Sequence, residues 1–71
     1  MNRINPKKLL HSKWTAAMPT YKEKHFIVSE VEYDDENNVA SCVIEAVLSN
    51  RIQSIDWETL KDDTVWKQGW K

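Results

Sequence analysis

The sequence has little of what small proteins normally use to form turns and cross-links. Its 71 residues include one glycine, one cysteine and two prolines. The single cysteine, Cys42, excludes an internal disulfide and a zinc site built from cysteine pairs. With Gly69 as the sole glycine, turns must depend on Asn, Asp, Ser and Pro. A lone cysteine without a disulfide framework is typical of a reducing compartment, so we expect a cytoplasmic protein.

Long hydrophobic runs are also lacking. The basic N-terminal stretch is followed by only two consecutive leucines, Leu9 and Leu10, which is too short for a signal peptide. No stretch approaches the roughly 20 apolar residues that a membrane helix needs. Hydrophobic residues still make up 41% of the chain, which argues against disorder. The sequence therefore predicts one small soluble domain over residues 1–71, with no membrane partner.

Tryptophan is the residue that the chain has in excess. Of its four tryptophans, Trp57, Trp66 and Trp70 lie within the last fifteen residues. A buried Trp removes about 150–250 Å² from water, so these side chains are the main candidates for the core of so small a domain. Four such side chains are hard to bury around one small sheet, and we expect at least one to be substantially exposed.

Charge is unevenly distributed although the net charge is only −1. Residues 1–25 hold six basic residues against one acidic residue, and residues 26–71 hold four basic against ten acidic. The chain has two arginines, Arg3 and Arg51. An anionic partner should therefore prefer the first third of the chain.

The pattern of apolar residues predicts a mainly β protein. Strands are expected at Lys13–Ala17, His25–Tyr33, Val39–Leu48 and Arg51–Ile55. Met18-Pro19-Thr20-Tyr21 is expected to break the first strand and start a loop, with a polar hairpin loop at 34–38 and a tight turn at Ser49-Asn50. The even positions of the third strand form an apolar face. The consecutive strands predict a small antiparallel meander, and a partly open SH3-like barrel is one way for it to curl.

Short helical turns are expected at both ends of the chain. Asn5 followed by Pro6 is typical of a helix start, because Asn caps the free N–H groups and Pro suits the first helical position. Asp56 is placed to cap a second turn in the same way.

The last segment fits two alternatives. In the first, Asp62 or Asp63 caps a short helix that runs through Trp66 and ends at Gly69. That helix would place Trp66 and Trp70, four residues apart, near one face. In the second, residues 64–67 form a short closing strand.

Several motifs occur together along the chain. They are Asn5-Pro6-Lys7-Lys8-Leu9-Leu10, Ser12-Lys13-Trp14-Thr15-Ala16, Glu23-Lys24-His25-Phe26, Cys42, Glu45-Ala46-Val47, Ser49, Asp56-Trp57, Leu60-Lys61-Asp62, Trp66 and Gly69-Trp70-Lys71. In this combination, which covers essentially the whole chain, the sequence resembles a family of small tryptophan-rich bacterial proteins. That family's function is uncharacterised, so the resemblance implies a single-domain protein but no catalytic or binding residue.

Residues suited to catalysis or metal binding are few and scattered. His11, His25 and Cys42 are metal-ligand types, but they come from different elements and no paired ligand spacing occurs. Glu45 interrupts an otherwise apolar strand, a placement found in acid–base sites; we expect it instead to pair with a lysine or with Arg51, or to face solvent. No nucleophile–base pair or cofactor motif is recognisable. We therefore expect a protein that is not an enzyme and uses no metal or cofactor.

Trp66 and Trp70 support the first hypothesis on function, a module that docks a protein partner. Tryptophan is over-represented at interface hot spots, and an exposed pair near the C-terminus would form an aromatic surface for a partner. The alternative for each side chain is packing in the core. Self-association of the domain also stays open.

The basic first third supports the alternative hypothesis, binding of single-stranded nucleic acid. Lysines neutralise phosphates while aromatic side chains stack on unpaired bases. Here Lys13 adjoins Trp14, Lys22 follows Tyr21, and Lys24 is two residues further on. The candidate residues are Lys13, Trp14, Lys22 and Lys24. The ten acidic residues of the remaining chain oppose this hypothesis unless folding separates them from the lysines.

Overall fold

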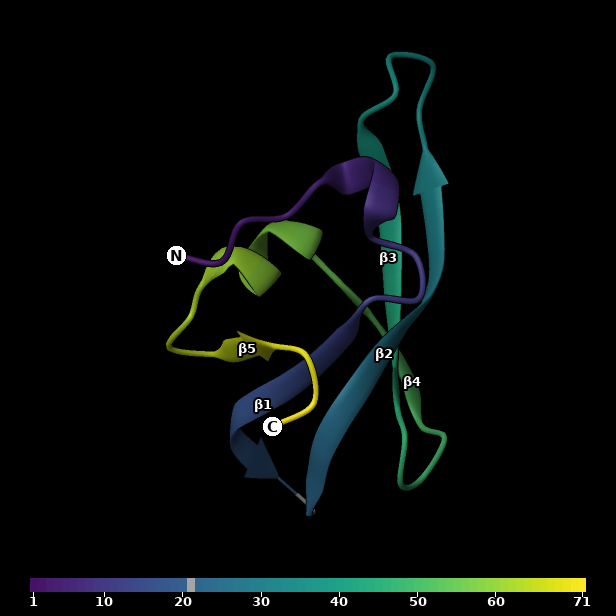
Figure 1. Cartoon of the computed structure of the whole chain (residues 1–71). Coiled ribbons are helices and arrows are strands. Elements are labelled where there is room, and N and C mark those ends of the chain that lie inside the picture. The colour runs from purple at the N-terminus through teal and green to yellow at the C-terminus, as the bar shows by residue number, and fades with distance from the viewer. Residues whose placement is uncertain (21) are drawn as a thin grey trace.

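A computed structural model describes residues 1–20 and 22–71 of the chain (Figure 1). Its elements are η1 (Pro6–Lys8), β1 (Lys13–Thr20), β2 (Glu23–Tyr33), β3 (Val39–Ala46), β4 (Ile52–Ile55), η2 (Trp57–Lys61) and β5 (Trp66–Gln68), where η denotes a 3-10 turn. The strands form one antiparallel sheet in the order β4-β3-β2-β1-β5. The predicted mainly β class is confirmed. The sheet is open, with β4 and β5 as its two edge strands.

The long strand β2 organises the sheet because it pairs with both β1 and β3. Phe26 in its middle lies opposite Trp14 of β1 and Ala46 of β3. The register shifts within β1, between Thr15 and Thr20, and within the β2–β3 pair. Irregularities of this kind bend strands and increase their twist. In Figure 1 the strands accordingly cross and curl rather than lie flat.

The core lies on one face of this curled sheet and is closed by the two helical turns. Its buried hydrophobic side chains are Leu9, Trp14, Phe26, Val28, Cys42, Ile44, Ala46, Leu60 and Trp66. Leu9 follows η1 and Leu60 belongs to η2, so each turn contributes a leucine to the core. Trp14 is only 2% exposed, and its Nε1 donates a hydrogen bond to Ser12 Oγ at 2.8 Å. Burial of this indole therefore leaves no donor unsatisfied.

Both predicted caps are confirmed. Asn5 Oδ1 accepts a hydrogen bond from the Lys7 N–H at 3.0 Å, and Asp56 Oδ1 accepts one from the Glu58 N–H at 3.0 Å. Each side chain satisfies a backbone donor that has no partner within its own turn.

Strand β1 is longer than predicted. The expected break over Met18–Tyr21 is wrong for its first three residues, since β1 continues to Thr20; Tyr21 lies outside the described residues. Proline lacks the N–H that a regular strand donates, and it is tolerated where a ladder is irregular. The register shift between Thr15 and Thr20 provides that irregularity.

Strand β3 is shorter than predicted. Cys42, Ile44 and Ala46 are buried as expected, but Leu48 is 71% exposed. The strand ends at Ala46 because the chain turns back there, with the Asn50 N–H donating to the Ala46 carbonyl at 2.8 Å. Asn50 has the left-handed backbone (φ 58°) expected of a turn asparagine.

The segment after η2 forms a strand, so the predicted C-terminal helix is wrong and the alternative of a closing strand is confirmed. The Asp62 carbonyl accepts hydrogen bonds from the Val65 and Trp66 N–H groups, at 3.1 and 2.9 Å, which forms a turn. Strand β5 then pairs with β1, Trp66 lying opposite Ala16. Pairing with β1 satisfies backbone groups that a single helical turn would leave free.

The acidic β2–β3 loop lies far from the C-terminal segment. The β2–β3 loop, which carries Asp34, Asp35 and Glu36, lies at the top of Figure 1, whereas β5 and the C-terminus lie in the lower half. Among the described residues, neither helical turn has the length and apolar character needed to cross a membrane.

Candidate functional site

The last six residues pass from the core to the outer face of the sheet. Trp66 pairs with Ala16, points into the core and is 8% exposed. Lys67, the next residue, points the other way because side chains alternate along a strand. Gly69 then turns the chain with φ 79°, and Trp70 lies on the outer face, 44% exposed. The prediction that at least one tryptophan is substantially exposed is therefore confirmed.

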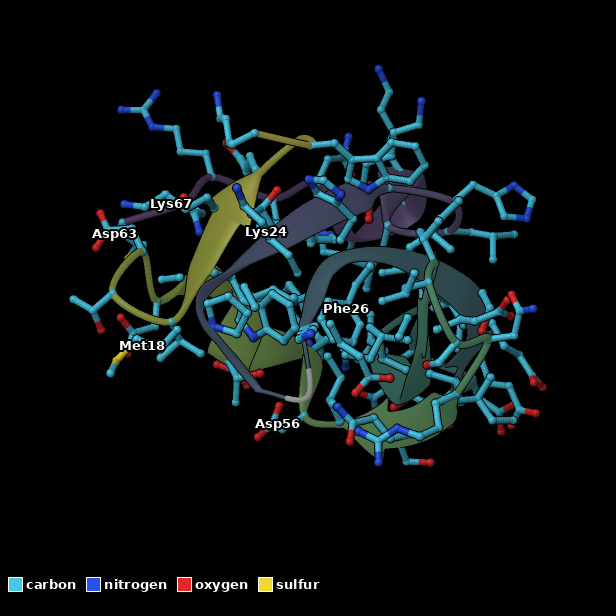
Figure 2. The ribbon with its side chains drawn as sticks, turned by 90° about the horizontal axis from the view of Figure 1, so that it is seen from below. Met18, Lys24, Phe26, Asp56, Asp63 and Lys67 are labelled. Atoms are coloured by element: carbon cyan, nitrogen blue, oxygen red, sulfur yellow. The ribbon has the colours of Figure 1, made fainter. Side chains whose placement is uncertain are left out.

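An apolar groove separates the two edge strands on the core side. Its main cavity, of about 220 Å³, is lined by Phe26 and Trp66, whose rings pack edge to face with centroids 5.1 Å apart. Met18, which is 84% exposed, and Val65, 46% exposed, form its rim, and Gln53 of β4 forms the opposite wall. Figure 2 shows Phe26 inside the curl of the ribbon and Met18 at its outside.

A smaller cavity of about 80 Å³ extends this space along β4. It shares Phe26 and Gln53 with the main cavity and adds Ile52, which is 64% exposed. We call the two cavities together the edge groove.

The edge groove contains one buried carboxylate, Glu23, which is 3% exposed. Arg51 binds it in a bidentate manner, with Nη2 at 2.5 Å from Oε1 and Nε at 3.1 Å from Oε2. The Ser49 hydroxyl also donates to Oε2. The Ser49 hydrogen bond and the Arg51 guanidinium hold the pKa of the Glu23 carboxyl below its ordinary value. The carboxylate is thus ionised and balanced by a positive charge.

This ion pair adds a partner that the sequence did not predict. Arg51 binds Glu23, whereas for Glu45 we expected a pair with a lysine or with Arg51, or exposure to solvent. Glu45 is half-buried, with Ile27 of β2 and Ile52 of β4 opposite it in the sheet. The β3–β4 turn, which contains Arg51, lies beside Glu23 at the start of β2.

Trp70 is fixed on the outer face by contacts from three directions. Its Nε1 donates to the Phe26 carbonyl at 3.0 Å. The Lys13 ammonium lies 4.7 Å from the centroid of the Trp70 ring, a cation–π distance. The His25 ring packs against it with centroids 5.9 Å apart. The indole is therefore held in place, although Trp70 as a residue stays 44% exposed.

Thr15 anchors the backbone on both sides of Trp70. Its hydroxyl donates to the Gly69 carbonyl at 2.7 Å and accepts from the Lys71 N–H at 2.9 Å. In the sheet Thr15 lies opposite both His25 and Lys67, so these side chains share its face. We call this surface the Trp70 patch; it comprises Lys13, Thr15, His25, Lys67, Trp70 and Lys71.

The structure distributes the predicted site residues differently from the sequence hypotheses. Trp66 and Trp70 lie on opposite faces of the sheet, so they form no common surface. Trp14 is a core residue, whereas Lys13 beside it contacts Trp70. Lys22 and Lys24 are exposed. Tyr21, the aromatic residue before Lys22, lies outside the described residues.

Sequence reasoning missed Thr15, His25 and Glu23 as parts of these surfaces. Thr15 and His25 meet Trp70 only because β1, β2 and the C-terminal segment lie together, about fifty residues apart in sequence. Glu23 did give a signal, since it is the one acidic residue among six basic ones in the first 25 residues.

Fold and surfaces together define a small open β-sheet protein, with two tryptophans and a phenylalanine in its core and a groove between its edge strands. The chain belongs to the tryptophan-rich protein family DUF2389, whose family model matches residues 12–71. The resemblance seen in the sequence is thereby confirmed at the level of the family. No curated protein and no solved structure matches the chain.

Proposed function

We propose that the protein is a non-catalytic cytoplasmic binding module and that a partner protein docks in the edge groove. The observation that carries the proposal is an accessible apolar cavity between two edge strands, lined by Phe26 and Trp66. An edge strand has backbone donors and acceptors that a further strand can use. Trp66, rather than Trp70, thus provides the aromatic surface for this partner.

The occupant that fits is an extended segment with one bulky apolar side chain. Peptides commonly bind by adding a strand to a sheet edge and placing a side chain in a neighbouring pocket. The main cavity, about 220 Å³, exceeds the roughly 150 Å³ of an engineered cavity that holds benzene. Because Arg51 already balances Glu23, the groove favours an uncharged side chain over a charged one.

The fold itself supports this proposal. The strand order β4-β3-β2-β1-β5, a bent β2 shared by both halves and a 3-10 turn before the last strand are features of small SH3-like barrels. We propose that the domain is such a barrel, left open where β4 and β5 face each other. In this interpretation the edge groove is the unfilled seam of the barrel.

A synthetic peptide tests the proposal, for example the alternating sequence Ser-Val-Ser-Leu-Ser-Val-Ser, titrated into labelled protein and followed by amide NMR. We expect shifts in β4 and in the Trp66 indole. Val65→Glu places a charge on the rim and should weaken binding at least about tenfold. Leu10→Glu is the matched control, since Leu10 and Val65 are both 46% exposed. No shift in β4, or equal loss in both variants, would refute docking in the groove.

A further inference from the structure

Among the described residues, two lysine–tryptophan contacts have similar geometry but lie in opposite electrostatic surroundings. Lys61 Nζ lies 4.4 Å from the Trp57 ring centroid, and Lys13 Nζ lies 4.7 Å from that of Trp70. The Trp57 contact belongs to η2, which is preceded by Asp56, includes Glu58 and is followed by Asp62. The Trp70 contact lies among cationic side chains. Only the second environment suits an anion.

The Trp70 patch concentrates positive charge around an accessible aromatic ring. Lys13, Lys67 and Lys71 are exposed, and none of the six residues of the patch is acidic. Asp63, the acidic residue beside Lys67 in Figure 2, is bound by the amino group of Met1 at 2.7 Å. On the other side, Ile27 of β2 stands between Lys13 and Glu45 in the sheet. The acidic β2–β3 loop lies at the far end of the molecule from β5 (Figure 1).

We propose that the Trp70 patch binds single-stranded nucleic acid, a site distinct from the edge groove. An unpaired base stacks on Trp70 while Lys13, Lys67 and Lys71 neutralise the phosphates around it. Stacking on an aromatic side chain beside a basic track is how sequence-tolerant single-strand binders work. An acidic peptide would form ion pairs with the lysines but would leave the indole without a stacking partner. A single-stranded nucleic acid can form both kinds of contact.

The number of lysines sets the expected salt dependence. Each neutralised phosphate of a single strand contributes about −0.7 to the slope of log Kobs against log salt concentration. Three contacts predict a slope of about −2 and thus an affinity loss of about 20-fold between 50 and 200 mM salt. This value is measurable and is smaller than that of a protein with an extended basic groove.

The test is a titration of the full chain with an oligothymidylate of eight nucleotides. Binding is followed by tryptophan fluorescence and by the NMR signals of the four indole N–H groups. We expect saturable quenching at low salt, with the largest NMR shift at Trp70. Trp70→Leu should lower the affinity about tenfold, and Trp57→Leu should not. Trp70→Leu also removes the hydrogen bond from Trp70 Nε1 to the Phe26 carbonyl. Lys67→Gln therefore serves as a second variant, because it keeps that hydrogen bond. It should reduce the salt slope by about 0.7, with Lys61→Gln as its control.

Four outcomes would overturn the proposal. They are absence of quenching at low salt, binding that does not respond to salt, equal losses for Lys61→Gln and Lys67→Gln, and shifts confined to the edge groove. Poly-glutamate that binds as tightly as the oligothymidylate would assign the patch to an acidic protein partner instead.

Discussion

Glu23 shows how one carboxylate is held inside a small domain. It is 3% exposed, yet its oxygens receive hydrogen bonds from the Arg51 side chain and the Ser49 hydroxyl. Removing one member of such a pair leaves a buried charge without a partner. The resulting loss of stability is far larger than the net contribution of the intact pair. Arg51 and Ser49 both belong to the β3–β4 turn, so the pair also fixes that turn to the start of β2.

The pH dependence of stability follows from the same contacts. The folded-state pKa of Glu23 lies below its unfolded value, so its contribution is fully present above about pH 4.3 and is lost as the pH falls through the folded pKa. Urea unfolding measured from pH 7 down to pH 3 should show this loss. In Glu23→Gln that part of the pH dependence should be missing. An identical pH profile in both proteins would show that the ion pair does not contribute.

Strand β5 is the element on which both surfaces depend. It carries Trp66 to the floor of the edge groove, and the turn after it carries Trp70 to the outer face. Gly69 makes that turn possible, because its φ of 79° is a conformation that other residues rarely adopt.

Replacing Gly69 tests this dependence. An added Cβ would meet no atom within 4 Å, so the cost of Gly69→Ala is the backbone strain alone, about 1–2 kcal/mol. Gly69→Asn should cost less, since asparagine tolerates the left-handed region. Urea denaturation of the three proteins measures the difference. Equal stability of Gly69→Ala and the original chain would mean that the C-terminal turn contributes nothing to folding.

Local sequence predicted the elements that local interactions determine. Asn5 and Asp56 cap their turns as expected, and the β2–β3 hairpin follows directly from its apolar strands and polar loop. Segment 64–70 was ambiguous because Asp62 and Gly69 suit both a capped helix and a turn with a strand. The partner that decides between them, Ala16 on β1, lies fifty residues earlier. For the same reason, the spacing of Trp66 and Trp70 in the sequence could not show that the two side chains lie on opposite faces of the sheet.

The two ends of the chain close the molecule together. Asn2 Nδ2 donates to the Leu60 carbonyl at 2.8 Å and to the Trp66 carbonyl at 2.7 Å, which joins the N-terminal segment to η2 and β5. The Gln68 side chain donates to the Arg3 carbonyl at 2.6 Å. A core of this size depends on such links, because a short chain buries little surface on folding.

Asn2→Ala should therefore lower the free energy of unfolding by about 1–3 kcal/mol, since two half-buried carbonyls lose their donor. Arg3→Ala is the matched control. Its exposed side chain can be removed while the backbone carbonyl that Gln68 binds is kept, and the expected change is within about 0.5 kcal/mol. Thermal or urea unfolding distinguishes the two. Similar values for both variants would show that the N-terminal segment is not held by Asn2.

The acidic β2–β3 loop and the lysines of the Trp70 patch lie in different parts of the molecule, so its surface charge is locally uneven although the net charge is only −1. Such a molecule does not approach a charged surface in random orientation. A sulfonate resin would attract it by the C-terminal end and a quaternary-amine resin by the hairpin tip, so the protein can be retained on both at neutral pH and low salt. An immobilised sample would then expose a different end on each support.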